Sequence, residues 1–176
     1  MWSGKHVLVT GGAGFIGSQL VDRLLAAGAR VSVFDNFSTG YREFVPPRDG
    51  LRVIEGDLLG EAITGAMRGV DMVFHLAANA DIKDNLLEPR RCIDQNVVAT
   101  QNVLEAMRAA GVRDIAFSST GSVYGGGERG WIGDSPRILL DTARIRALGW
   151  APTRTIEESV VDTLRWLAES PYVERT

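Results

Sequence analysis

The stretch TGGAGFIG at residues 10–17 joins a short β-rich run to a segment in which apolar residues have helical spacing. Residues 6–10 (HVLVT) form the β-rich run, and apolar side chains then recur every three or four positions from Phe15 to Ala27. This stretch contains three glycines with the spacing GxxGxxG: Gly11, Gly14 and Gly17. This order of patterns predicts a strand, a glycine-rich turn and a helix.

Strand and helix patterns continue to alternate up to about residue 118. Four further strand patterns occupy residues 30–34, 51–55, 71–76 and 114–118. A long helix pattern runs from Leu87 to Ala110, and Gly111 follows as its stop. Alternating strands and helices, with nearly continuous apolar strands, predict an α/β fold. We expect a Rossmann-type, doubly wound parallel sheet of five main strands in the order 3-2-1-4-5.

The pattern changes after Tyr124, where three consecutive glycines form a flexible or turn-forming run. Residues 138–140 fit one short strand, and Asp141 can cap a helix that continues to Ala147 and ends before Gly149. The sequence TIEE at residues 155–158 is a capping-box pattern and predicts a last helix to about Ala168. We therefore expect two domains, 1–125 and a short, mainly helical segment 126–176.

Composition excludes several classes of function. The chain has 176 residues, 45% of them hydrophobic, and a net charge of -3, so no basic field attracts nucleic acid or a membrane surface. Its one cysteine, Cys92, cannot form an intrachain disulfide, which fits a reducing cytoplasm. Residues 1–10 run directly into a strand pattern, and no apolar run reaches the roughly 20 residues that span a bilayer. We expect a cytoplasmic protein without a metal site.

The glycine stretch has the chemistry of a dinucleotide site. Gly11 permits a tight turn, Gly14 lets a pyrophosphate approach the backbone, and Gly17 lets the helix pack against the strand. Phe15 and Ile16 then belong to the first helical turn, whose N–H groups and partial positive charge suit phosphates. The alternative is a glycine-rich turn that serves packing alone.

Residues at the ends of the next strands fit the same site. Asp35 lies 18 positions after Gly17, where a carboxylate can accept hydrogen bonds from the ribose of NAD and repel the 2′-phosphate of NADP. Arg42 is close in sequence, so NADP stays open. After the third strand, Asp57 in the sequence Gly56-Asp57-Leu58 could reach the adenine amine, or could be a simple turn residue. After the fourth strand, the small residues of Leu76-Ala77-Ala78 let the backbone approach the cofactor.

Together these segments resemble the extended short-chain dehydrogenase/reductase family, the NAD-dependent epimerases and dehydratases. The resemblance is strongest to nucleotide-sugar 4-epimerases such as UDP-glucose 4-epimerase. The matching segments within residues 5–125 are TGGAGFIGS, VFDNFSTG, EGDL, HLAANA, DQNVVATQNVLEA and FSSTGSVYG. The resemblance implies NAD as cofactor, a UDP-sugar as ligand, and Asn36 and Leu58 as further cofactor contacts.

The resemblance also implies roles for individual residues. Thr120 matches the catalytic Ser/Thr that hydrogen-bonds the sugar 4-hydroxyl, and Gly121-Ser122 stand where dehydratases have an Asp-Glu pair. Asn96 matches the helix asparagine that supports the site near the nicotinamide; its alternative is a polar residue on the helix surface. Arg129 would pair with the diphosphate and Asp134 with the uridine ribose, unless the tail is an ordinary exposed loop.

The sequence departs from this family at the catalytic Tyr-x-x-x-Lys pair. Its tyrosines are Tyr41, Tyr124 and Tyr172, and the residues four positions later are Val45, Glu128 and Thr176. The chain thus resembles an internally truncated member that passes from the fifth strand directly to the late substrate-binding segment. The fifth strand would then be an open sheet edge through which the chain could form a homo-oligomer.

Three functions compete on this sequence: a nucleotide-sugar 4-epimerase, a module that binds NAD or a UDP-sugar without catalysis, and an inactive deletion product. The missing tyrosine and lysine favour the second and third for the chain by itself. His6 and His75 are expected to be structural.

Overall fold

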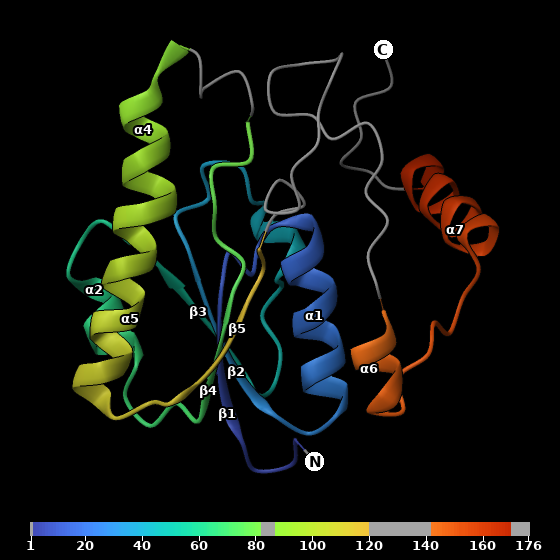
Figure 1. The fold of residues 1–176 in the computed structure, drawn as a ribbon, viewed down its shortest axis with the longest axis horizontal. Coiled ribbons are helices and arrows are strands. Elements are labelled where there is room, and N and C mark those ends of the chain that lie inside the picture. The colour runs from blue at the N-terminus through green and yellow to red at the C-terminus, as the bar shows by residue number, and fades with distance from the viewer. Residues whose placement is uncertain (1, 82–86, 120–141, 170–176) are drawn as a thin grey trace. The chain divides into compact units, whose positions relative to one another are not determined.

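The computed structural model describes residues 2–81, 87–119 and 142–169. The chain divides into two compact units, Met1–Ser119 and Thr120–Thr176, which are described separately (Figure 1). The domain boundary expected after residue 125 lies outside the described residues. In the part of the chain described, no helix is long and apolar enough to cross a membrane.

The first unit is built on a five-stranded parallel sheet with the order β3-β2-β1-β4-β5, which confirms the predicted topology. The strands are β1 (His6–Thr10), β2 (Arg30–Asp35), β3 (Leu51–Glu55), β4 (Met72–His75) and β5 (Asp114–Phe117). Among the described residues β5 pairs with β4 alone, and association of two copies through its outer edge stays a prediction.

Helices cover both faces of this sheet (Figure 1). The helical segments of this unit are α1 (Phe15–Ala26), the 3₁₀ turn η1 (Arg42–Phe44), α2 (Ala62–Ala66), α4 (Pro89–Ile93), the π-helical turn η2 (Asp94–Val98) and α5 (Ala99–Ala110). The helix predicted from residue 87 to 110 is therefore helical over most of its length, with a π turn in the middle. The short helix α2 was not predicted, because five residues carry too little periodicity to identify a helix.

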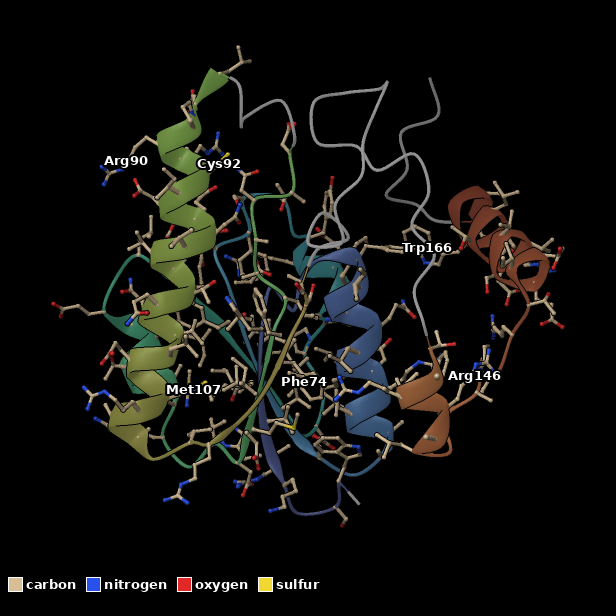
Figure 2. The ribbon with its side chains drawn as sticks, in the orientation of Figure 1. Phe74, Arg90, Cys92, Met107, Arg146 and Trp166 are labelled. Carbon is tan, nitrogen blue, oxygen red and sulfur yellow. The ribbon has the colours of Figure 1, made fainter. Side chains whose placement is uncertain are left out.

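The core consists of two apolar layers, one on each face of the sheet, and successive side chains of β1 point alternately into one layer and the other. Val7 and Val9 lie in the layer with Val21 and Leu24 of α1. Leu8 points to the opposite layer, in which Phe34 and Val73 pack with α2 and α5. Figure 2 shows Met107 pointing from α5 toward the sheet, where it is buried. A sheet that is apolar on both faces keeps its strands fixed, so the loops at their carboxyl ends have defined positions.

The second unit contains two described helices, α6 (Ala143–Ala147) and α7 (Ile156–Glu169). Helix α6 has Thr142 at its N-cap position, and the predicted cap, Asp141, lies outside the described residues. The predicted capping box at α7 is confirmed: the Thr155 N–H donates to Glu158 Oε2 at 2.8 Å, and the Glu158 N–H donates to Thr155 Oγ1 at 3.1 Å. The strand predicted at residues 138–140 lies outside the described residues.

Candidate functional site

A cavity of about 280 Å³ lies at the carboxyl ends of β1, β2, β3 and β4. Ligands of doubly wound sheets bind at this edge, and roughly 300 Å³ is the lower bound for small-molecule sites. Most of the residues predicted for the cofactor line this cavity: Gly11, Gly14, Asp35, Asn36, Asp57, Leu58, Leu76, Ala77 and Ala78. The topology thus brings together residues from four separate segments of the sequence.

Two glycines fix the turn after β1. Gly11 has a φ of +68°, and a Cβ there would lie 2.7 Å from the backbone N of Ala77. A Cβ on Gly17 would overlap the carbonyl oxygen of Gly11. Both positions therefore require glycine, the first for its conformation as well as its space, the second for the close packing of α1 on the turn.

Gly14 keeps the start of α1 open. Its φ of -78° is ordinary, and a Cβ there would meet only the carbonyl oxygen of Gly11, at 3.3 Å. As the N-cap of α1 it supplies no capping side chain, and the first turn contains no acidic residue. The cavity therefore meets the positive end of a twelve-residue helix with no carboxylate of that turn beside it.

Phe15, Ile16 and Gly17 do not line the cavity. The side chains of Phe15 and Ile16 point to solvent, with 54% and 69% of each residue exposed. The sequence thus placed them correctly in the first turn of α1, and their contact with a cofactor stays a prediction.

Asp35 holds two loops of the site. The residue is 9% exposed, and its Oδ2 accepts from the Ala13 N–H at 2.9 Å. Its Oδ1 accepts from the Phe37 N–H, also at 2.9 Å. A carboxylate oxygen can accept more than one hydrogen bond, so these contacts leave capacity for a ligand in the cavity that Asp35 lines.

Asn36 and Asp57 connect the loops after β2 and β3. The Asn36 Nδ2 donates to Asp57 Oδ2 at 3.2 Å, and Asn36 Oδ1 accepts from the Ser38 N–H at 3.1 Å. Asp57 Oδ1 accepts from the Leu59 N–H at 2.8 Å, which is the turn role left open for this residue. Both residues also line the cavity, so the turn and the cavity wall share the same side chains.

His75 is a buried structural residue, as expected. Its Nδ1 lies 2.6 Å from Thr10 Oγ1, and its Nε2 lies 2.9 Å from Thr100 Oγ1. The Thr100 hydroxyl donates its one proton to the Asn96 carbonyl at 2.7 Å, so it accepts from Nε2–H and leaves Nδ1 to accept from Thr10. Burial lowers the pKa of His75 below its usual value. The neutral imidazole thus joins β1, β4 and α5.

Asn96 supports the cavity wall from the π turn η2. Its Oδ1 accepts from the Asn79 N–H at 2.8 Å, and its Nδ2 donates to the Asn79 carbonyl at 3.1 Å. Asn79 lines the cavity and Asn96 does not. The Asn96 amide is thus engaged with the loop after β4, and its role near a nicotinamide stays a prediction.

Several cavity residues were not anticipated from the sequence. They include Ser38, Thr39, Gly40, Asn79, Arg91 and Gln95. Gly40 offers the clearest missed signal: its Cβ would lie 2.9 Å from the Cβ of Ala13, and the next residue, Tyr41, donates its N–H to the Ala13 carbonyl at 3.0 Å. Thr120, Arg129 and Asp134 lie outside the described residues.

Comparisons with known proteins agree with this geometry. The family model described as "NAD dependent epimerase/dehydratase family" matches residues 7–140. A UDP-glucose 4-epimerase of Streptomyces lividans is 42% identical over 127 residues, which are 70% of this chain and 38% of that protein. The chain thus spans about two fifths of that relative.

Solved structures similar to this chain are also nucleotide-sugar epimerases. A Thermus thermophilus UDP-glucose 4-epimerase in complex with NAD is 42% identical, with a TM-score of 0.64 over 76% of this chain and 44% of the other. A Thermotoga maritima UDP-glucose 4-epimerase with UDP-glucose is 36% identical, with a TM-score of 0.63 over 70% of this chain and 41% of the other.

Proposed function

The chain belongs to the NAD-dependent epimerase/dehydratase family, and we propose that its first unit binds NAD in the cavity at the carboxyl edge of the sheet. One observation carries the proposal: the uncapped start of α1 at Gly14 and the carboxylate of Asp35 line the same cavity. A diphosphate needs the first group and a ribose the second.

The residues of the cavity fit the parts of this cofactor. Gly14 carries no side chain at the start of α1, so a diphosphate would be able to approach the backbone there, and Gly11 forms the turn that leads to it. Asp35 would accept from the ribose hydroxyls and Asp57 from the adenine amine, and both residues line the cavity. Ala77 and Ala78 would let the nicotinamide end approach the backbone after β4. When bound, NAD would supply a hydride acceptor.

The family resemblance extends the proposal to nucleotide sugars of the UDP-glucose and UDP-galactose type. Thr120 would contact the sugar 4-hydroxyl, Arg129 the diphosphate and Asp134 the uridine ribose. The sequence contains no Tyr-x-x-x-Lys pair to take the proton of that hydroxyl. We therefore propose a protein of the 4-epimerase family that binds its ligands and has no turnover by itself; the expected cytoplasmic location stays a prediction.

Titration calorimetry with NAD tests the proposal. We expect saturable binding to the wild-type protein and a loss of at least about tenfold in Gly14→Val, because two methyl groups would stand at the helix start. Gly65→Ala, a change in α2 where a Cβ meets nothing within 4 Å, is the matched control and should bind like wild type. Absence of heat with both NAD and NADH in the folded wild-type protein would refute the proposal.

A second measurement separates binding from catalysis. Addition of UDP-galactose to the NAD-loaded protein should produce no absorbance of reduced nicotinamide and no UDP-glucose, because the proton acceptor is missing. Formation of UDP-glucose would show that another residue replaces the tyrosine. An inactive deletion product without a formed site would be distinguished from both the binding module and the active epimerase, because it would bind NAD weakly.

A further inference from the structure

An exposed ion pair lies next to the candidate ribose carboxylate. Glu55, the last residue of β3, is in register with Asp35 of β2, and the following Gly56 N–H donates to the Asp35 carbonyl at 3.0 Å. Arg42 of η1 donates from its guanidinium to Glu55 Oε2. The acidic partner of Arg42 is therefore the in-register neighbour of Asp35.

The same arginine also contacts the turn that Asp35 organises. The Arg42 guanidinium carbon lies 4.2 Å from the centre of the Phe37 ring, a cation–π geometry. The backbone N–H of Phe37, in turn, donates to Asp35 Oδ1. Phe37 has a φ of +56°, and the Asx turn from Asn36 to Ser38 helps to hold that conformation. Arg42 is thus held against the turn that follows Asp35, whose neighbouring residues Asn36 and Ser38 line the cavity.

Such an arginine has an evident use in a dinucleotide site. A cation near this carboxylate is the group that accommodates the 2′-phosphate of NADP, and a guanidinium can bind a phosphate through two N–H groups. In this chain, however, Glu55 and the Phe37 ring occupy the guanidinium. A phosphate would therefore have to displace Glu55 and would also meet its negative charge.

We propose that Glu55 is a specificity-determining residue, which favours NAD over NADP by neutralising Arg42 and holding it over Phe37. This inference rests on the proposed function, because it concerns the ligand of the same cavity. The Arg42 and Glu55 side chains are 58% and 60% exposed, and exposed ion pairs are weak. Loss of the Glu55 charge therefore leaves the Arg42 guanidinium without its acidic partner, held by the Phe37 ring alone, so that a 2′-phosphate can take the place of the carboxylate.

Dissociation constants for NAD and NADP in four proteins test the proposal. Glu55→Gln should bind NADP up to about fivefold more tightly than wild type, since an exposed pair contributes no more than about 1 kcal/mol, with the NAD constant changed by less than about twofold. The gain should disappear when Arg42→Gln is added, and it should shrink at high salt because the arginine is exposed. Asp22→Asn, which breaks the exposed Arg48–Asp22 pair on α1, is the matched control and should leave both constants unchanged.

The outcomes separate this inference from the proposed function. If NAD binds to all four proteins and Glu55→Gln leaves the ratio of the two constants unchanged, the role of Glu55 is refuted and NAD binding stands. A gain in NADP affinity that persists without Arg42 also refutes it, since the cation would then not be the cause. If neither dinucleotide binds to the wild-type protein, the proposed function and this inference both fail.

Discussion

Gly17 shows how the space around one backbone atom restricts the residue that the turn accepts. Its backbone conformation would suit alanine, and yet a Cβ would overlap the carbonyl oxygen of Gly11. Gly65 of α2 has the same helical conformation with nothing within 4 Å of its Cβ position. Gly17 and Gly65 therefore have the same helical backbone conformation and differ only in the space around the Cβ position, so Gly65 is a suitable control for Gly17.

We predict that Gly17→Ala lowers the free energy of unfolding by about 3 kcal/mol, because backbone must move to admit the methyl group. Gly65→Ala should be neutral or stabilising by up to about 1 kcal/mol through helix propensity. Urea unfolding followed by circular dichroism measures both. Equal effects of the two changes would show that α1 does not pack against the turn as described.

Asp35 is proposed both to stabilise two loops and to bind the ligand. Its substitution by asparagine, the neutral amide of the same shape, tests both roles. Asp35→Asn leaves one acceptor oxygen for two N–H donors, Ala13 and Phe37, and turns an amide N–H₂ toward one of them. We predict a loss of about 1–3 kcal/mol in stability and a fall of more than about tenfold in NAD affinity. A variant of unchanged stability in thermal unfolding would contradict the double role.

Among single residues, the sequence predicted those whose role follows from their position next to a strand in the chain. Gly11 and Asp35 are identified by their places after a strand and at the end of the next one. Gly40 and Asn79 lie in segments that match the family but were not assigned a role, because their roles depend on contacts with Ala13 and Asn96, 27 and 17 positions away in the chain. The carboxylate of Asp57 was assigned two alternative roles, and it takes part in the turn while it lines the cavity.

His75 joins β1, β4 and α5 through its hydrogen bonds. Because its pKa is lowered in the folded protein, the stability of the first unit depends on pH. Burial lowers the pKa of His75 in the folded protein, while the unfolded chain titrates near the ordinary value of 6.5. Between these two pKa values the unfolded state binds more protons. The free energy of unfolding therefore falls as the pH drops below 6.5, at no more than about 1.4 kcal/mol per pH unit.

His75→Gln should remove this part of the pH dependence, at the cost of lower stability at neutral pH. His6→Gln, a change at the opposite end of the sheet, is the control for loss of an imidazole. Denaturant unfolding at neutral pH and at about pH 5 gives the slope for each protein. A slope in His75→Gln equal to that of the wild-type protein would show that His75 is not the group responsible.

The regular elements were predictable where their periodicity extends over several turns or strands. All five strands follow from short apolar runs between glycine and aspartate signals, and α1 and α7 from their apolar spacing and caps. Helix α2 and the π turn η2 were missed. The first is too short to show a period, and the second is stabilised by tertiary contacts, since the Asn96 amide bonds the loop after β4.

On the scale of the whole molecule, the two units must be treated separately in any stability measurement. A ligand that binds one unit stabilises that unit by mass action, by about 2.7 kcal/mol at a hundredfold excess over the dissociation constant. Two-state analysis of the full chain would hide this difference. The topology of the first unit could be predicted because a glycine-rich turn after the first strand and an acid at the end of the second are typical of the order 3-2-1-4-5.

Hydrogen exchange with and without NAD is the measurement that tests the central claim most directly, since it reads each segment in the intact chain. We predict slower exchange on addition of NAD in residues 11–17, 35–40 and 76–79, and unchanged exchange in α7. Unchanged exchange in the first three segments at saturating NAD, or protection confined to residues 143–169, would contradict the assignment of the cavity at the carboxyl edge of the sheet.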